Sequence, residues 1–454
     1  MSNATQTPNR LYFAVWRWHF YAGLYVIPFL IMLATTGLLM LWIAVLTGIG
    51  DEKLTIPRGD RLLAVSELTD AEAAIPGGVA TQFVAPMSPD HIATVAVTAG
   101  DTSTGVTLNP YTGVVLNQFP WRAGWYDFLS DIHGSLLIGD VGDRLIEAAA
   151  SLGLLLVISG IFLHWPREGW GKALTVQTAA KGRALWKSLH GAVGLWISLL
   201  LIVFLISGLS WAGIWGTKFV QAWSTFPAEK WDAVPLSDET HASMNHGAAK
   251  EVPWALEQTP MPESGSLAGT QAIDGPVTVD SVAAFADGLG FHNRFQLNLP
   301  ANETGVFTIS HDSMSNDGPD PAADRTIHID QYTGNVLADV RYADYSAYAK
   351  LMAWGVAFHE GDLGLWNIAL NTGFCLSVIL MAISGLVLWW MRRPVGARLG
   401  APPRPTDIPY AKGALLVTLG LSLAFPMLGL TLLAVIVLDL VVLTAVPPLK
   451  RLVN

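Results

Sequence analysis

The sequence predicts an integral membrane α-helical protein with a duplicated four-helix core, a C-terminal two-helix hairpin and two external α+β modules. Apolar residues make up 52% of the 454 residues and charged residues only 14%, which is too apolar for an ordinary soluble protein. Four apolar stretches, at about 18–46, 143–165, 187–213 and 364–391, are long enough to cross a bilayer. The polar stretches between them share a recurring segment, which indicates an internal repeat.

The first span is interpreted as an uncleaved signal anchor, because no small-residue cleavage site follows a short apolar core. The last apolar stretch is too long for one helix and is interrupted at Phe425-Pro426, which predicts two short helical arms. The expected elements are transmembrane helix 1 at 9–48, external module 1 at 49–140, helix 2 at 141–165, helix 3 at 186–216, external module 2 at 217–360, helix 4 at 362–391 and a transmembrane hairpin of helices 5 and 6 at 410–447.

The distribution of charge predicts the orientation. Lys and Arg gather between the second and third spans and directly after the fourth, whereas the two long polar stretches are acidic. The positive-inside rule then places both termini in the cytoplasm and both long loops outside. The net charge of −10 belongs to these outer loops, and no basic patch is present to meet phosphates. The lipid bilayer is therefore an expected partner and nucleic acid is not.

Both external modules contain the same local pattern. Residues 106–116 and 327–337 alternate apolar and polar side chains around a Tyr-Thr-Gly turn, which predicts a β-hairpin in each. A short helix is expected ahead of each hairpin, at 66–72 and at 279–285. The repeated unit is therefore a span, an external α+β module and a second span.

Histidines recur at matching positions of this unit. His19 and His190 lie 18 residues before Gly37 and Gly208. At about 1.5 Å per residue this separation is roughly 27 Å, close to the thickness of the hydrocarbon layer. Ionisable residues in membrane spans are usually functional, although a histidine near the interface can also face lipid headgroups. Axial ligation of a haem iron by one imidazole from each repeat is the functional interpretation.

His133 and His359 precede the second and fourth spans on the expected outer side. Their equivalent placement predicts a second bis-histidine haem site, and the alternative is two loop histidines beside helix starts. His19 and His190 would then ligate a haem at the inner face. Haems at both faces would carry electrons across the membrane.

A Ser/Thr-Gly pair recurs in all four spans. Small residues let helices approach closely, and they also leave room for a flat macrocycle, so both interpretations stay open. Gly37 and Gly208 are expected at the outer level with His133 and His359, and Gly160 and Gly385 at the inner level with His19 and His190. The four pairs are Thr36-Gly37, Ser159-Gly160, Ser207-Gly208 and Ser384-Gly385.

The cysteine count restricts the cofactor. Cys375 is the single cysteine, so disulfides within the chain and covalent c-type haem are excluded. Any haem must therefore be held non-covalently by side chains. His164, one turn beyond Gly160, is either a replacement ligand of the inner haem or a hydrogen-bond donor to a propionate. Arg167, Arg392 and Arg393 are either partners of the propionates or anchors at the cytoplasmic face.

Two further groups stay open. His241, Met244 and His246 combine imidazole and thioether, which suit soft or borderline metals, but exposed loops contain such mixtures by chance. Asp439 in the last apolar arm is either a functional acid in the membrane or the partner of a base at the inner face.

The chain resembles the PepSY-associated transmembrane family over roughly residues 9–449. The resemblance rests on the Tyr-Thr-Gly hairpins, on Trp165-Pro166-Arg167 at the end of the second span and on the histidines that start the first and third spans. It implies PepSY-like external modules in the periplasm and a multi-pass protein of the bacterial inner membrane, often iron-regulated. Members of this family reduce ferric siderophores through two b-type haems.

The predicted function is therefore a di-haem transmembrane oxidoreductase that passes electrons to a periplasmic acceptor, with a ferric siderophore as that acceptor. No flavin or nicotinamide fingerprint is present, so the donor is a quinol, another protein or a small reductant. Other classes are a siderophore or iron transporter without redox activity and a PepSY-type regulator of an external peptidase. The chain is not itself a protease of the His-Glu-x-x-His type, because it lacks that motif.

Overall fold

The computed structural model describes residues 10–50, 52–166, 169–245, 251–315, 317–393, 400–402 and 411–437. Arg167, His246 and Asp439 lie outside the described residues. The chain forms two compact units. The helical unit consists of Met1–Thr36, Ile132–Val220 and Leu370–Asn454, and the sheet unit consists of Gly37–Asp131 and Gln221–Ala369.

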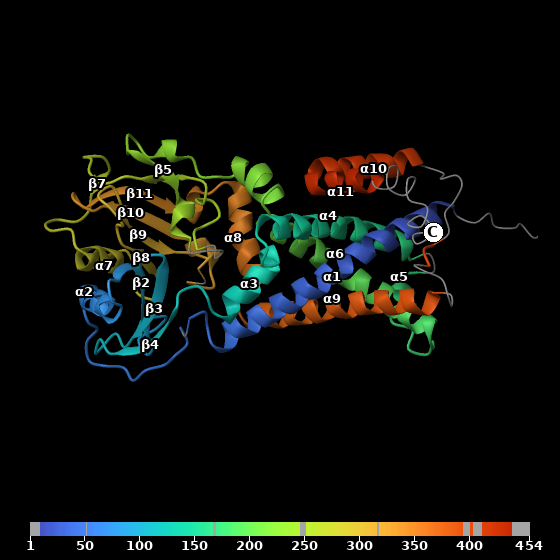
Figure 1. The fold of residues 1–454 in the computed structure, drawn as a ribbon, viewed down its shortest axis with the longest axis horizontal. Helices are drawn as coiled ribbons and strands as arrows, with labels where there is room; N and C mark the ends of the chain where they lie inside the picture. Colours follow the sequence, from blue (N-terminus) through green and yellow to red (C-terminus); the bar gives the residue numbers. More distant parts are fainter. Residues whose placement is uncertain are drawn as a thin grey trace, which may run out of the picture. The chain divides into compact units, whose positions relative to one another are not determined.

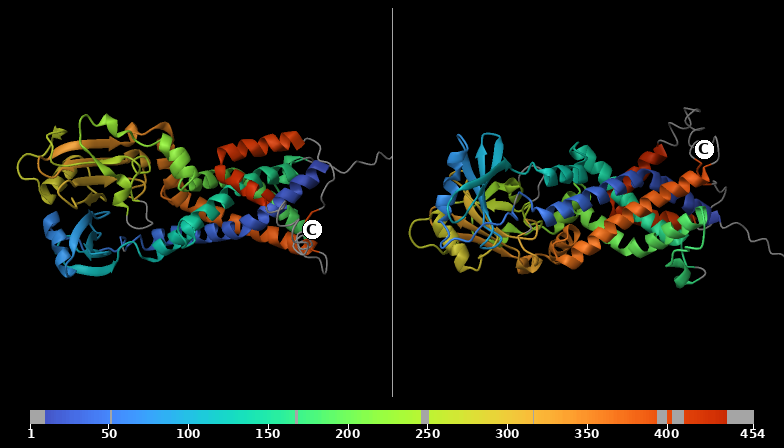
Figure 2. Two further views of the ribbon diagram at one scale, coloured as in Figure 1. Left: turned by 45° about the horizontal axis from the view of Figure 1, so that its top comes forward. Right: turned by 90° about the horizontal axis from the view of Figure 1, so that it is seen from below.

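Four long apolar helices, which run alongside one another (Figures 1 and 2), build the helical unit. The shortest has 24 residues, and at about 1.5 Å per residue it exceeds the roughly 30 Å of a bilayer's hydrocarbon layer. The prediction of four spans is confirmed by length and composition. The helices are α1 (Arg10–Leu46), α4 (Asp140–Leu163), α6 (Arg183–Leu209) and α9 (Leu365–Arg392).

The predicted C-terminal hairpin corresponds to α10 (Ala411–Ala424) and α11 (Pro426–Val437). Pro426 opens α11, where a missing N–H and a fixed φ suit the first helical turn. The indole Nε1 of Trp215 donates to the carbonyl of Ala424 at 2.7 Å, and its ring stacks on Phe425. These two contacts therefore fix Trp215 against Ala424 and Phe425, where α10 ends and α11 begins. Residues 438–447 of the predicted hairpin lie outside the described residues.

A nine-stranded antiparallel sheet, in the order β4-β3-β2-β1-β8-β9-β10-β11-β7, forms the sheet unit (Figure 1). One apolar core lies between this sheet and the two helices α2 and α7, with Leu68, Val282, Leu297 and Ile309 buried in it. The elements are α2 (Val65–Thr69), β1 (Val79–Val84), β2 (Ala93–Ala99), β3 (Thr102–Leu108), β4 (Val115–Pro120), β7 (Thr270–Gln271), α7 (Val279–Gly288), β8 (Gln296–Asn298), β9 (Val306–His311), β10 (Arg325–Asp330) and β11 (Asn335–Arg341).

Shorter elements connect these parts. They are η1 (Asp70–Ala74), α3 (Trp125–Ser135), α5 (Trp170–Ala173), η2 (Trp215–Val220), η3 (Gln221–Trp223), η4 (Ala228–Lys230), β5 (Leu236–Thr240), η5 (His241–Met244), β6 (Pro260–Pro262), η6 (Pro321–Ala323), η7 (Tyr342–Asp344) and α8 (Ala347–Glu360). Strands β5 and β6 pair with each other as a separate two-stranded sheet.

Both predicted hairpins are present, as β3–β4 and β10–β11. Their turns are built alike. The side-chain oxygen of Asn109 accepts the amide of Tyr111 at 2.9 Å, and that of Asp330 accepts the amide of Tyr332 at 2.8 Å. The glycine of each Tyr-Thr-Gly turn has a φ of +69°, a left-handed conformation that favours glycine.

The strands of the two predicted external modules form one sheet, an arrangement that the sequence did not predict. Strand β1 pairs with β8, with Phe83 opposite Leu297. The amide of Gln82 donates to the Gln296 side chain at 2.7 Å. Alone, each set of strands would leave an edge strand with unsatisfied N–H and C=O groups, and this pairing satisfies them.

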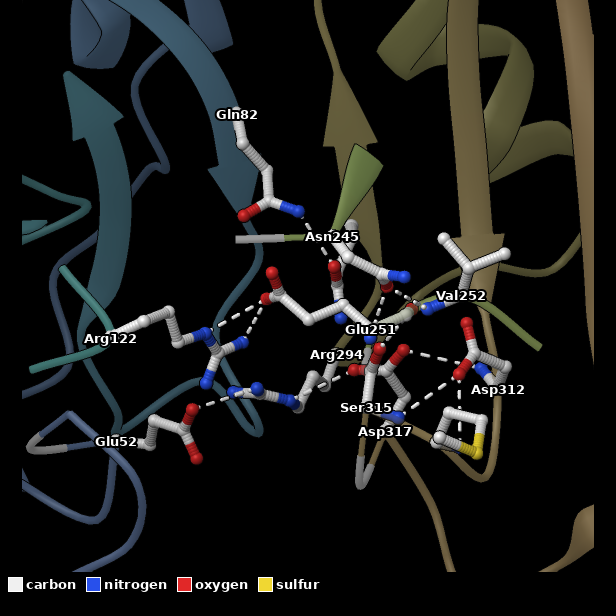
Figure 3. Close-up of polar contacts among 12 residues, drawn as sticks. Glu52, Gln82, Arg122, Asn245, Glu251, Val252, Arg294, Asp312, Ser315 and Asp317 are labelled. Carbon is white, nitrogen blue, oxygen red and sulfur yellow. Dashed lines mark hydrogen bonds and ion pairs between the residues drawn. The ribbon is translucent and has the colours of Figure 1, made fainter. Parts of the chain in front are cut away.

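Ion pairs link the two chain segments of the sheet unit (Figure 3). Arg294 donates to Glu52 at 2.8 Å and to Asp317 at 3.0 Å, and its side chain is only 5% exposed. Arg122 pairs with Glu251 in the same region. Buried charges are tolerated only when paired and hydrogen-bonded, so these contacts position residues 52 and 122 on the second segment.

Candidate functional site

One cavity in the helical unit contains the first predicted histidine pair. Its volume is about 430 Å³, within the roughly 300–1,000 Å³ range of small-molecule and cofactor sites. Side chains of α1, α4, α6 and α9 line it, and most of them are apolar. His19 enters from α1 and His190 from α6. The structure therefore brings together two imidazoles from the two predicted repeats.

Each of these histidines contacts a serine through the same ring nitrogen. Nδ1 of His19 lies 2.8 Å from Oγ of Ser159 on α4. Nδ1 of His190 lies 2.9 Å from Oγ of Ser384 on α9 and 3.1 Å from the carbonyl oxygen of Met381. A carbonyl oxygen only accepts, so Nδ1 of His190 carries the proton and Nε2 keeps its lone pair.

The glycine after each serine lies against the same ring. A Cβ added to Gly160 would be 3.4 Å from Cε1 of His19, and one added to Gly385 would be 3.4 Å from Cε1 of His190. An added Cβ would therefore be in van der Waals contact with each ring. Gly160 and Gly385 are thus beside His19 and His190, at the level that the sequence predicts for them.

Positive side chains line part of the cavity wall, namely Arg183, Lys187 and Arg392. The Arg392 guanidinium lies 5.0 Å from the ring centroids of Trp16 and Phe20, and it donates to the carbonyl of Gly400 at 2.6 Å. Arg393 instead lies over Trp389 and Trp390. A cavity with two facing imidazoles, glycines beside them and cations in its wall fits an anionic planar tetrapyrrole such as haem.

His164 also lines the cavity, but its ring is held differently. Nε2 of His164 lies 2.9 Å from the carbonyl oxygen of Ala173, so Nε2 carries the proton. The ring packs on Gly191, where an added Cβ would be 2.4 Å from ring atoms. His164 therefore links the end of α4 to the last residue of α5, and its Nε2 is not available to a metal.

The second predicted pair is divided between the two units. His133, in the part of α3 that belongs to the helical unit, has Nδ1 2.8 Å from Oγ1 of Thr36 on α1. His359 lies half-buried near the end of α8 in the sheet unit. Gly37 is half-buried on α1 and Gly208 is exposed on α6. Joint ligation by His133 and His359 stays a prediction.

Sequence reasoning missed the role of the hydroxyl in the Ser/Thr-Gly pairs. Both sequence interpretations concerned the glycine, yet Thr36, Ser159 and Ser384 each contact a histidine Nδ1. The recurrence of a hydroxyl residue before every one of these glycines was the available signal.

The histidine at 241 forms a pair that the sequence did not indicate. His241 lies buried in the sheet unit with Nε2 2.9 Å from Nε2 of His328, a residue of β10. Nδ1 of His241 donates to the carbonyl of Thr259 at 2.7 Å, and Thr308 contacts Nδ1 of His328 at 2.9 Å. Among the described residues, no group of three His, Cys, Asp or Glu side chains that could hold a metal ion is found.

These contacts assign one proton to each ring. Nδ1 of His241 carries its proton, so its Nε2 accepts from Nε2–H of His328, whose Nδ1 accepts from the Thr308 hydroxyl. Both imidazoles are neutral and fully bonded. Burial lowers the pKa of His241 to about 4, and burial together with His241 lowers the pKa of His328 well below its usual value.

Replacing His241 with glutamine should weaken the pH dependence of unfolding. Between about pH 4 and 6.5 the unfolded chain binds a proton that buried His241 does not, so this histidine's contribution to stability falls as the pH drops. The full difference is on the order of 3 kcal/mol at about 1.4 kcal/mol per pH unit. Glutamine can donate to Thr259 and accept from His328 without titrating.

The measurement is urea unfolding of wild type and His241→Gln, followed by tryptophan fluorescence, from pH 7.5 to pH 4. Trp231 lies 6.1 Å from both imidazole rings and reports on the pair. Burial raises the pKa of Asp317 to about 6 and of Asp324 to about 7, so the contribution of these carboxyl groups to stability falls as the pH rises. Both proteins contain these two groups. The difference between their pH profiles therefore isolates the contribution of His241. Parallel pH profiles for the two proteins would contradict the assignment.

Comparison with known protein families identifies the family of this chain. A family model described as the PepSY-associated TM region matches residues 16–392, more than half of the chain. No curated protein matches the sequence. The matched region includes His19, His164 and His190, which line the cavity, and all four long helices with the exception of the first residues of α1.

Proposed function

The chain belongs to the PepSY-associated transmembrane family, and from this premise we propose that it is a di-haem membrane oxidoreductase that reduces ferric siderophores. In this proposal the chain spans the bacterial inner membrane with both termini in the cytoplasm and with the sheet unit in the periplasm. Two b-type haems connect the two faces, with His19 and His190 as axial ligands of one and His133 and His359 as axial ligands of the other.

The observation that carries the proposal is the cavity that His19 and His190 share. Two neutral imidazoles facing one apolar space are the ligand set of a low-spin b-type haem. Bound there, haem would supply a one-electron Fe(III)/Fe(II) couple whose potential depends on its axial ligands and its burial. Arg183, Lys187 and Arg392 would pair with the propionates, and the apolar wall would exclude water.

The strand order of the sheet unit supports the proposed duplication. Strands β1 to β4 and β8 to β11 are each consecutive antiparallel runs, each with one helix, α2 or α7, ahead of the first strand. Ser66 of α2 donates its backbone amide and hydroxyl to Asp280 of α7, at 2.9 and 2.6 Å. We propose that the two runs are PepSY-like modules joined through β1 and β8.

Reduction of the siderophore's iron explains what such an enzyme would achieve. One electron converts Fe(III) to Fe(II), a softer ion that hard oxygen ligands bind more weakly. The iron can then leave its chelator. The electron donor in this proposal is a quinol, another protein or a small reductant.

Anaerobic mixing of the reduced protein with a ferric hydroxamate siderophore and an Fe(II)-specific chelator should give haem oxidation, with one Fe(II) trapped per haem oxidised. The gallium(III) complex of the same siderophore is the matched control, because Ga(III) has the same charge and a similar size but is not reduced. It should leave the haem bands unchanged. Equal spectra with both complexes would contradict the proposal, and siderophore uptake by proteoliposomes without a reductant would favour a transporter.

A further inference from the structure

Three histidines of the helical unit make the same contact with a hydroxyl. Nδ1 lies 2.8 Å from Ser159 in His19, 2.9 Å from Ser384 in His190 and 2.8 Å from Thr36 in His133. In every case the hydroxyl residue lies on a different helix and directly precedes a glycine. The same Nδ1–hydroxyl contact thus occurs in both predicted repeats, which indicates that the three hydroxyl groups have the same role.

The proton of each hydroxyl is already used within its own helix. Ser159 donates to the carbonyl of Leu155 at 2.7 Å, Thr36 to Met32 at 2.9 Å and Ser384 to Met381 at 2.8 Å. A hydroxyl has one proton, and a carbonyl oxygen only accepts. The hydroxyl oxygen therefore presents a lone pair to the histidine, and Nδ1 must be the donor.

The position of the proton on Nδ1 also determines the state of the second ring nitrogen, Nε2. A neutral imidazole with its proton on Nδ1 has a free lone pair on Nε2, which is the form that binds a metal. His164 has the opposite tautomer, since its Nε2 donates to Ala173. The hydrogen bonds thus leave Nε2 free to bind a metal in His19, His190 and His133, but not in His164.

We propose that Thr36, Ser159 and Ser384 are positioning residues that fix the Nδ1–H tautomer and the ring orientation of His133, His19 and His190, so that Nε2 is ready to bind iron. The hydroxyl accepts from Nδ1, and Gly160 and Gly385, which follow Ser159 and Ser384, lie against the rings of His19 and His190, so these two Ser-Gly pairs each work as one unit. The identity of the metal rests on the proposed function, whereas the tautomers do not.

Solid-state NMR of the haem-free protein with ¹⁵N-labelled histidine, in lipid, reads the tautomers directly. His19 and His190 should show a protonated Nδ1 and His164 a protonated Nε2. Ser159→Ala should convert His19 to a mixture of tautomers. Ser377→Ala is the matched control, because Ser377 makes the same bond to its own helix, at 2.6 Å to Gly373, without a histidine contact among the described residues. A protonated Nε2 on His19 of the wild type would overturn the proposal.

The haem-loaded protein gives a second readout. Loss of an acceptor at Nδ1 makes imidazole a weaker donor to the iron, so Ser159→Ala should raise the midpoint potential of the inner haem and weaken haem binding about 10- to 100-fold. Ser159 is the residue to change because Nδ1 of His190 would keep the Met381 carbonyl as an acceptor in Ser384→Ala. Ser159→Thr should restore both values, and Ser377→Ala should leave them unchanged. An unchanged potential in Ser159→Ala would contradict the proposal. Correct tautomers in a chain that binds no haem would reject the proposed function alone.

Discussion

Replacing His190 with alanine is expected to halve the haem content of the protein, from two haems per chain to one. The variant keeps the cavity but removes one of its two axial nitrogens, and low-spin b-type haem needs both. A pyridine haemochrome assay on the purified chain measures the ratio. His19→Ala should give the same loss, because both histidines line the same cavity.

His164→Ala is the control for this result. His164 lines the same cavity, yet its Nε2 is bonded to Ala173. The variant should keep both haems and a bis-histidine spectrum. Loss of a haem in His164→Ala, or full haem content in His190→Ala, would show that the ligands have been assigned wrongly.

Valine at position 385 is expected to exclude the inner haem without removing any ligand. A Cβ at this position already lies 3.4 Å from Cε1 and 3.8 Å from Nδ1 of His190, so the two further methyl groups of valine have to displace the ring. Overpacking of this kind costs about 1–3 kcal/mol and forces side chains from their rotamers. Haem content should fall by one per chain, as in His190→Ala.

Gly373→Val provides the comparison within the same helix. Gly373 is exposed on α9 and has no atom within 4 Å of an added Cβ, so valine there changes helix propensity alone. This variant should bind two haems. If Gly385→Val also binds two haems with an unchanged spectrum, the glycine is not needed beside the ring.

Local patterns in the sequence predict much of the fold. Apolar runs of helical length mark α1, α4, α6 and α9, and the interruption at Phe425-Pro426 marks the break between α10 and α11. Alternation around Tyr-Thr-Gly marks the two hairpins, because strand periodicity and turn chemistry are both short-range signals. The relation of His19 to Gly160 followed from counting residues along helices of known rise.

Contacts between distant residues could not be predicted in this way. The pairing of β1 with β8 joins residues more than 200 positions apart, and nothing in either strand's pattern specifies that partner. The contact between His241 and His328 joins residues 87 positions apart, and it forms only when the segment around His241 folds onto β10. A serine before a glycine in a membrane helix is typical of close helix packing. Its contact with a histidine can be recognised only when the residue on the neighbouring helix is known.

The absorbance spectrum of the purified chain, with a count of haems per chain, tests the central claim most directly. Expression with haem supplied should give a red protein with two b-type haems per chain, and dithionite should sharpen the bis-histidine α-band. A colourless protein, or haem below one per chain after haem-replete expression, would contradict the assignment of the histidines as haem ligands.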